Sequence, residues 1–191
     1  MCESFAIALD RLSARDASER LASGLLDADF TTAETSVRWL WFAELLDSAW
    51  GLSGRLRDTR QLDTAGLRCL EYISDLCRRQ IARTTLAAEW TTAADVADRA
   101  ARHQQDVGTT AAYMALAAAH ALALECLDAP PEGCDTAGFA FHALALAAPD
   151  DSTAREWIHQ ALDELDRCAD IVPMSVRYPS GSDHLVDVIA S

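Results

Sequence analysis

Two histidines lie in the most apolar parts of the chain, and two thiols and the carboxylate of Glu125 are among the residues between them. Imidazole nitrogens and thiolate sulfurs are typical ligands of a soft metal such as zinc, so two such segments packed as a hairpin could form a site. No two of these residues have the i, i+4 spacing that places ligands on one helical face. We therefore expect no metal and no cofactor. The residues are His120, Glu125, Cys126, Cys134 and His142.

Glu44 and Asp47 lie three residues apart in the Trp-rich segment 32–50. Paired carboxylates beside an aromatic pocket could act as general acid and base. Large aromatic side chains more often form a core, because they bury the most area per residue. The sequence also lacks a nucleophile elbow, an HExxH pair, a Walker loop, a CxxC pair and a dinucleotide fingerprint. The balance favours a protein that is not an enzyme.

The segment 107–127, VGTTAAYMALAAAHALALECL, contains Glu125 as its one formal charge. Alanine has the best helix propensity, and Thr109 or Thr110 can cap the helix that we predict over residues 109–128. A membrane span needs about 20 strongly apolar residues, whereas most residues here are alanine. We therefore expect a helix that is buried in a water-soluble protein, with neighbouring helices in close contact around it.

Apolar periodicity and capping signals predict helices on both sides of this central one. The fold class we predict is all-α, a helical bundle or stacked helix pairs of about seven helices. It forms a single domain over residues 1–172, followed by a C-terminal tail, 173–191, rich in Pro, Gly and Ser. The segment 51–62, GLSGRLRDTRQL, is expected to be a solvated connection or a salt-bridge partner for the acidic half. The flanking helices are expected near residues 3–27, 32–50, 63–83, 91–105, 136–148 and 150–169.

Three short matches recur in the same order along the chain. DTAG stands at 63–66 and 135–138, Glu-Trp at 89–90 and 156–157, and AxDxxDRxA at 93–101 and 161–169. Two degenerate units of paired helices would explain them. Biased Ala, Asp and Arg composition would also explain them, and it is the favoured explanation because the offset between matches drifts, although a duplication stays open.

The six cysteines, Cys2, Cys69, Cys77, Cys126, Cys134 and Cys168, include no CxxC pair. The first residues, MCESFAIALDRL, lack the basic region and long apolar run of a signal peptide. We therefore expect reduced cysteines that act as small core residues in a cytoplasmic protein.

Acidic residues are concentrated in the second part of the chain. The net charge is −14, and all 16 basic residues are arginine. Residues 1–85 have a net charge of −2, whereas residues 86–191 contain 5 Arg and 17 acidic residues, a net charge of −12. Such a field repels nucleic acid and anionic membranes and attracts basic partners, although acidity also serves solubility alone.

Three pieces of the second half, TTAAYMALAAAHALALECL, AGFAFHALALAA and REWIHQALDEL, resemble Ala-rich helical immunity proteins of bacterial toxin systems. The resemblance covers roughly residues 64–170 and implies a toxin-neutralising role in a bacterium. It identifies no functional residue.

The leading prediction is therefore a non-enzymatic, acidic module that binds a basic protein and neither nucleic acid nor a membrane. An alternative is a small enzyme or small-molecule binder with a pocket between segments 32–50 and 109–148, lined by Glu44, Asp47, His120 and His142. A third is a subunit of a larger assembly, since the sequence leaves homo-oligomerisation open. The expected partner-binding carboxylates are Glu132, Asp135, Asp150, Asp151, Asp163, Glu164, Asp166 and Asp170.

Overall fold

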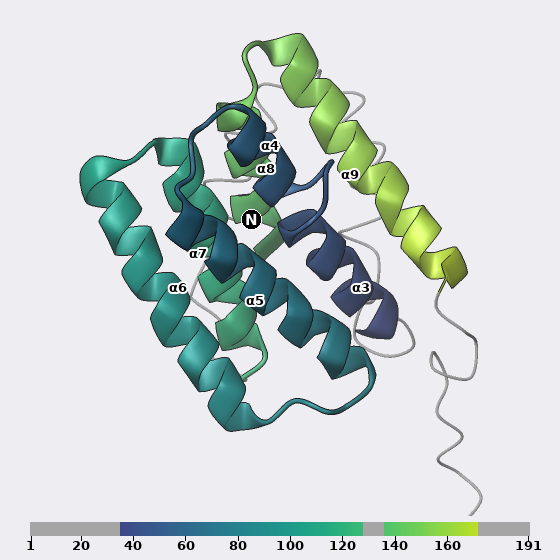
Figure 1. Ribbon diagram of the computed structural model, residues 1–191. Helices are drawn as coiled ribbons and strands as arrows, with labels where there is room; N and C mark the ends of the chain where they lie inside the picture. Colours follow the sequence, from purple (N-terminus) through teal and green to yellow (C-terminus); the bar gives the residue numbers. More distant parts are fainter. Residues whose placement is uncertain (1–34, 128–135, 172–191) are drawn as a thin grey trace, which may run out of the picture.

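The computed structural model describes residues 35–127 and 136–171. Over these residues the chain forms seven α-helices and no strand, which confirms the predicted all-α fold. In Figure 1, α6 forms the left-hand edge of the bundle and α9 the right-hand edge. The helices are α3 (Thr35–Leu46), α4 (Leu52–Asp58), α5 (Thr64–Ile81), α6 (Ala87–Val107), α7 (Thr110–Glu125), α8 (Thr136–Ala147) and α9 (Asp151–Ile171).

The Ala-rich helix α7 is central to the packing, as predicted. Its most extensive contacts are with α6 and α8, and it also contacts α4 and α5. Nine of its 16 residues are buried, six of them alanines with an exposed fraction of 1% or less, so neighbouring backbones come close on several sides. Thr109 caps it, because its hydroxyl accepts a hydrogen bond from the Ala112 N–H at 3.1 Å.

The aromatic residues of α3 belong to the hydrophobic core. Trp41 is fully buried, its ring lies 6.1 Å from that of Phe141 on α8, and its indole N–H donates to the Ala161 carbonyl of α9 at 2.7 Å. Trp39 lies 6.1 Å from Trp90 of α6. One helix is thereby tied to three others. The helix ends at Leu46, four residues before the predicted end.

The prediction of a solvated connection over 51–62 was wrong. This segment contains α4, in which Leu52 and Leu56 are fully buried. A Cβ at Gly54 would lie 2.3 Å from the Ala49 carbonyl oxygen, so glycine is what allows α4 to pack against the chain before it. Arg55 places its guanidinium carbon 4.5 Å from the Trp157 ring centroid and donates to Gln160 of α9 at 2.8 Å. The helix is therefore docked rather than solvated.

The start of α6 also differs from prediction. Thr91 and Thr92 do not cap it, because their hydroxyls donate to the carbonyls of Ala87 and Ala88 inside the helix. The helix begins one turn earlier, where the Glu89 carboxylate accepts the Leu86 N–H at 2.8 Å. Glu89 also pairs with Arg79 of α5 at 2.8 Å, which joins the two helices.

The matched segments of the internal repeat occupy different positions along their helices. Asp63 caps α5 by accepting the Gly66 N–H at 2.7 Å, whereas Asp135 lies outside the described residues. Trp90 is the fourth residue of α6 and Trp157 the seventh of α9, although both indoles are buried. A duplication would therefore require about one extra turn at the start of α9, and it stays a prediction.

Three cysteines of the described residues lie in the core. Burial raises the pKa of the Cys69 and Cys168 thiols to about 11, and it raises the pKa of Cys77 well above the ordinary value.

None of the helices over 35–127 and 136–171 combines the length and the hydropathy needed to span a bilayer.

These thiols should be protected from alkylation in the native protein. With iodoacetamide at pH 8 and mapping of the peptides by mass spectrometry, we expect Cys69, Cys77 and Cys168 to react far more slowly than in denaturant, because the thiolate is the nucleophile. The half-buried Cys126 is the internal comparison and should react faster. Labelling of Cys69 at the denatured rate would contradict its burial.

The same shifts give stability a pH dependence. Because the folded-state pKa of Cys69 and Cys168 is raised from 9.0 to about 11, the folded state retains protons that the unfolded state loses. Their contribution to stability is therefore complete below pH 9 and is lost as the pH rises towards 11. Urea titrations across this range would detect the decline.

Candidate functional site

The outer face of α9 contains exposed carboxylates. Ser152, Glu156, His159 and Asp163 follow the i, i+4, i+7, i+11 spacing that places side chains on one side of a helix. Glu156 and Asp163 are exposed, and Asp151 is exposed at the start of the helix. Glu156 is absent from the carboxylates expected to bind a partner. The sequence already shows that it lies four residues after Ser152 and seven residues before Asp163, on the same side of a helix.

Two of the expected partner-binding carboxylates also hold the fold together. Asp150 lies just before α9, where its carboxylate accepts the Thr153 N–H at 2.8 Å and the Thr153 hydroxyl at 3.2 Å. The hydrogen bond from the Thr153 backbone is the main reason that the pKa of Asp150 is lowered. Glu164 is half-buried and pairs with Arg167 one turn later. Asp150 and Glu164 are thus partly committed to α9 itself.

The side chains of four of the expected partner-binding carboxylates are not described by the structure. Glu132 and Asp135 lie outside the described residues, and for Asp166 and Asp170 the description covers the α9 backbone and not the side chains. The acidic face of α9 is therefore formed here by Glu156 and Asp163, with Asp151 exposed at the start of the helix.

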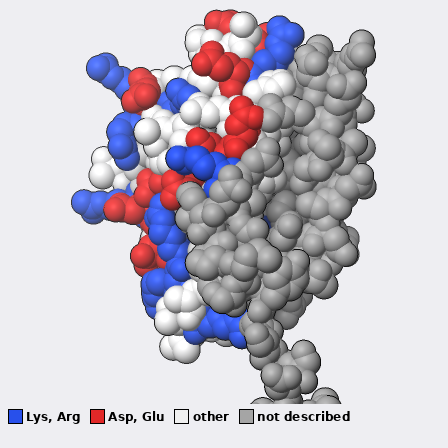
Figure 2. Space-filling view, turned by 90° about the vertical axis from the view of Figure 1, so that its right-hand side faces the viewer, with Lys and Arg blue, Asp and Glu red and all other residues white. Residues whose placement is uncertain are grey.

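On the described part of the face shown in Figure 2, arginine and acidic side chains lie next to one another. Among the described helices, Arg78 of α5 pairs with Glu44 of α3 at 3.1 Å. Within α6, Arg102 pairs with Asp98 at 2.9 Å. Part of the negative charge is therefore neutralised by arginines within the described helices.

The four expected pocket residues occupy different environments. Glu44 accepts from Arg78, and Asp47 accepts from the Ser53 hydroxyl at 2.8 Å. His142 is buried within α8, whereas His120 of α7 is half-buried. Within the described part of the chain, no three His, Cys, Asp or Glu side chains are grouped so that they could hold a metal ion.

Glu125, the lone charge of α7, connects three helices. Its carboxylate pairs with Arg38 of α3 and accepts the Thr136 hydroxyl at 2.6 Å and the Thr136 N–H at 3.4 Å at the start of α8. A carboxylate at a helix N-terminus satisfies backbone donors and interacts favourably with the helix dipole. Glu125 was grouped with the two histidines as a possible metal ligand. In the structure its carboxylate instead links α3 and α8 to the end of α7.

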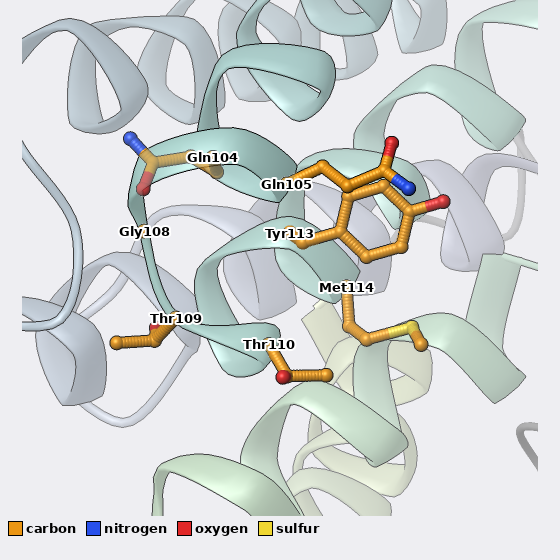
Figure 3. A pocket seen from close by; sticks show the side chains of 7 residues that line it. All are labelled: Gln104, Gln105, Gly108, Thr109, Thr110, Tyr113 and Met114. Carbon is orange, nitrogen blue, oxygen red and sulfur yellow. The ribbon is translucent and has the colours of Figure 1, made fainter.

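Two adjoining hollows lie where α6 turns into α7, and sequence reasoning missed both. The first has a volume of about 260 Å³ and is seen in Figure 3. The second, of about 380 Å³, extends to the loop between α4 and α5. The first is lined by Gln104, Gln105, Gly108, Thr109, Thr110, Tyr113 and Met114. The second is lined by Arg60, Gln61, Leu62, Asp63, Gln104, Gly108 and Thr109.

Few features of the sequence indicate these hollows. Gly108 marked a break between two helices, but glutamine, threonine and tyrosine in the neighbouring positions match no catalytic or ligand-binding motif. None of the four expected pocket residues lines either hollow. A loop and a turn 48 residues apart in the sequence meet here, since the Thr109 hydroxyl donates to the Gln61 carbonyl.

Comparisons with known proteins provide no relative for this chain. No family model matches it, and neither the curated proteins nor the solved structures gave a significant match.

Proposed function

We propose that this chain is a non-enzymatic module that binds a basic protein through the acidic face of α9. The observation that supports this most directly is the exposure of Glu156 and Asp163 on one side of α9, with Asp151 at its start. These residues belong to the half of the chain that has a net charge of −12. Such a surface attracts cationic partners and increases their rate of encounter.

The packing of the described helices favours the exterior as the working surface. The aromatic residues of α3 fill the core, and Glu44 and Asp47, the carboxylates that could have served catalysis, are bound to Arg78 and Ser53. A pocket between segments 32–50 and 109–148 is the alternative, and it would need those carboxylates to be released from their partners.

Neutralisation of a toxin is the concrete form of this proposal. It rests on the resemblance of residues 64–170 to Ala-rich helical immunity proteins. Neutralisation by binding requires a charged surface that fits the toxin and does not require a reactive side chain. The partner would then be a basic toxin whose cationic surface meets α9.

The test uses the protein that copurifies with the tagged full-length chain from its native host. We expect the variant Glu156→Gln/Asp163→Asn to associate about tenfold more slowly at low salt, and the difference to shrink at high salt, because exposed charges act mainly through steering. Stopped-flow or surface plasmon resonance measures the association rate.

The matched control is Asp95→Asn/Asp75→Asn, which also removes two exposed carboxylates, but from α6 and α5. It should associate nearly as fast as the parent. If both double variants slowed association equally, the total charge of the protein and not the face of α9 would set the rate. An association rate that does not change with ionic strength would exclude the proposal.

A further inference from the structure

Arg55 of α4 is half-buried against α9 and forms no ion pair with any residue that the structure describes. Its guanidinium carbon lies 4.5 Å from the Trp157 ring centroid, and one of its Nη atoms donates to the Gln160 side-chain oxygen at 2.8 Å. Both of these contacts are with neutral side chains. The positive charge of Arg55 is therefore not neutralised within the described part of the fold.

Arg38 of α3 shows how the same fold satisfies another half-buried arginine. Its guanidinium carbon also lies over an aromatic ring, 5.4 Å from the centroid of Phe42, and the guanidinium pairs with the Glu125 carboxylate. Arg55 has the aromatic ring but lacks the carboxylate, and its Nε–H is sealed from solvent without an acceptor among the described residues. Partial burial of a charge without a counter-charge costs free energy, which a carboxylate from outside the chain would recover.

Arg55 retains N–H donors for such a carboxylate. A guanidinium has five N–H donors in one plane, of which one is bound to Gln160 and the sealed Nε–H is another. The second Nη atom has no hydrogen-bond partner among the described residues and is not sealed from solvent. Contacts with Trp157 and Gln160 restrict the orientation of the group, so the remaining donors are pre-organised for the oxygens of a carboxylate.

The acidic face of α9 lies directly beside Arg55. Gln160 is four residues after Glu156 and three residues before Asp163, and these spacings make side chains neighbours on a helix. In Figure 1, α4 lies beside the first half of α9, in agreement with the contact between Arg55 and Gln160. A partner that covers Glu156 and Asp163 therefore also meets Arg55.

From these features we infer that Arg55 recognises a carboxylate of the partner, while Glu156 and Asp163 bind the cations around that carboxylate. The inference rests on the proposed function and specifies the partner's chemistry: a basic surface with an Asp or Glu side chain among its lysines and arginines. A uniformly cationic surface would bury Arg55 against like charge, which weakens binding. Arg55 thereby discriminates among basic proteins, because specificity requires that wrong partners be repelled.

Two peptide probes test this recognition. Each is a short lysine-rich peptide, blocked at both ends, and the central residue is glutamate in one and glutamine in the other. Total charge favours the glutamine peptide, because the chain has a net charge of −14. We expect the opposite for the full-length chain at low salt. The glutamate peptide should bind about fivefold more tightly in isothermal titration calorimetry, because its carboxylate pairs with Arg55.

The variant Gln160→Glu separates recognition from a purely structural role of Arg55. It places a carboxylate of the chain itself where Arg55 already donates, so the contact between α4 and α9 is kept while the guanidinium is neutralised. This variant should bind the glutamine peptide at least as tightly as the parent and lose the preference for glutamate. Gln105→Glu adds the same charge at an exposed position of α6, so it is the matched control and should keep the preference.

Arg55→Gln should lose the preference as well, and thermal melts of each variant confirm that it folds. A preference for the glutamine peptide in the parent, or equal binding of both peptides, would overturn the inference. A preference for glutamate that persists in Gln160→Glu or in Arg55→Gln would also overturn it, because the carboxylate would then be bound elsewhere.

The double variant Glu156→Gln/Asp163→Asn distinguishes failure of this inference from failure of the proposed function. It should weaken binding of both peptides to a similar degree, since both use their lysines on α9. If the parent bound neither peptide saturably, or if the double variant bound both as tightly as the parent, the proposed function and the inference would both be contradicted. If the double variant weakened both peptides but the parent did not prefer glutamate, only the inference would be wrong.

Discussion

Replacement of Trp41 by alanine is expected to lower the free energy of unfolding by about 4 kcal/mol, as for other fully buried tryptophans. The indole is 0% exposed, contacts Phe42 and Phe141, and donates to the Ala161 carbonyl. Its removal leaves a cavity where α3, α8 and α9 meet, and the rigid helices around it relax only partly. Chemical denaturation followed by circular dichroism measures the loss.

Two variants separate the causes. Trp41→Phe keeps most of the apolar volume but loses the N–H donor, so it should cost much less, about 1–2 kcal/mol. Leu40→Ala changes a half-buried neighbour on the same helix and should also cost less than Trp41→Ala. If Trp41→Ala were no more destabilising than Leu40→Ala, the contact between α3 and α9 would not have the role described here.

Replacement of Ala119 by leucine is expected to destabilise the protein by about 3 kcal/mol, at the upper end of the overpacking range. Ala119 is 0% exposed on the helix that contacts both α6 and α8. A larger side chain must push a neighbouring helix outward, because protein interiors contain few voids that could accept it. Urea denaturation at constant pH would measure the change.

Ala117→Leu is the matched control, since position 117 is half-buried on the same helix and the chemical change is identical. It should alter stability by less than about 1 kcal/mol. The difference between the two variants reports the packing around α7 independently of helix propensity, which is the same for both. Equal stability of the two variants would mean that α7 is not enclosed as the structure has it.

Much of the architecture could be predicted because it depends on local patterns. The alanine-rich run with Thr109 before it was enough to predict α7 and its cap, and the Trp-rich segment was enough to predict a buried α3. The errors occurred where local signals were weak. Leu52 and Leu56 have helical spacing, but glycines and arginines around them obscured a helix of seven residues. At α6 the threonines looked like caps, whereas Glu89 fixes the start through the Leu86 N–H.

The candidate sites could be predicted less well than the fold. The charge excess of the second half was visible in the sequence, but which carboxylates are exposed depends on how α9 packs, and this adds Glu156 and commits Asp150 to a cap. The two hollows beside the α6–α7 turn could not be predicted, because the lining of the second comes from a loop and a turn far apart in the chain.

The sequence by itself determined that this protein is helical, that its alanine-rich helix is buried, and that its second half is acidic. These properties follow from propensity, hydropathy and charge, which are read residue by residue. The tertiary structure alone decided that Glu125 joins Arg38 to Thr136, and that Arg60 and Gln104 line the same hollow. Such contacts depend on the relative placement of whole helices, and that placement is set by the packing of many side chains at once.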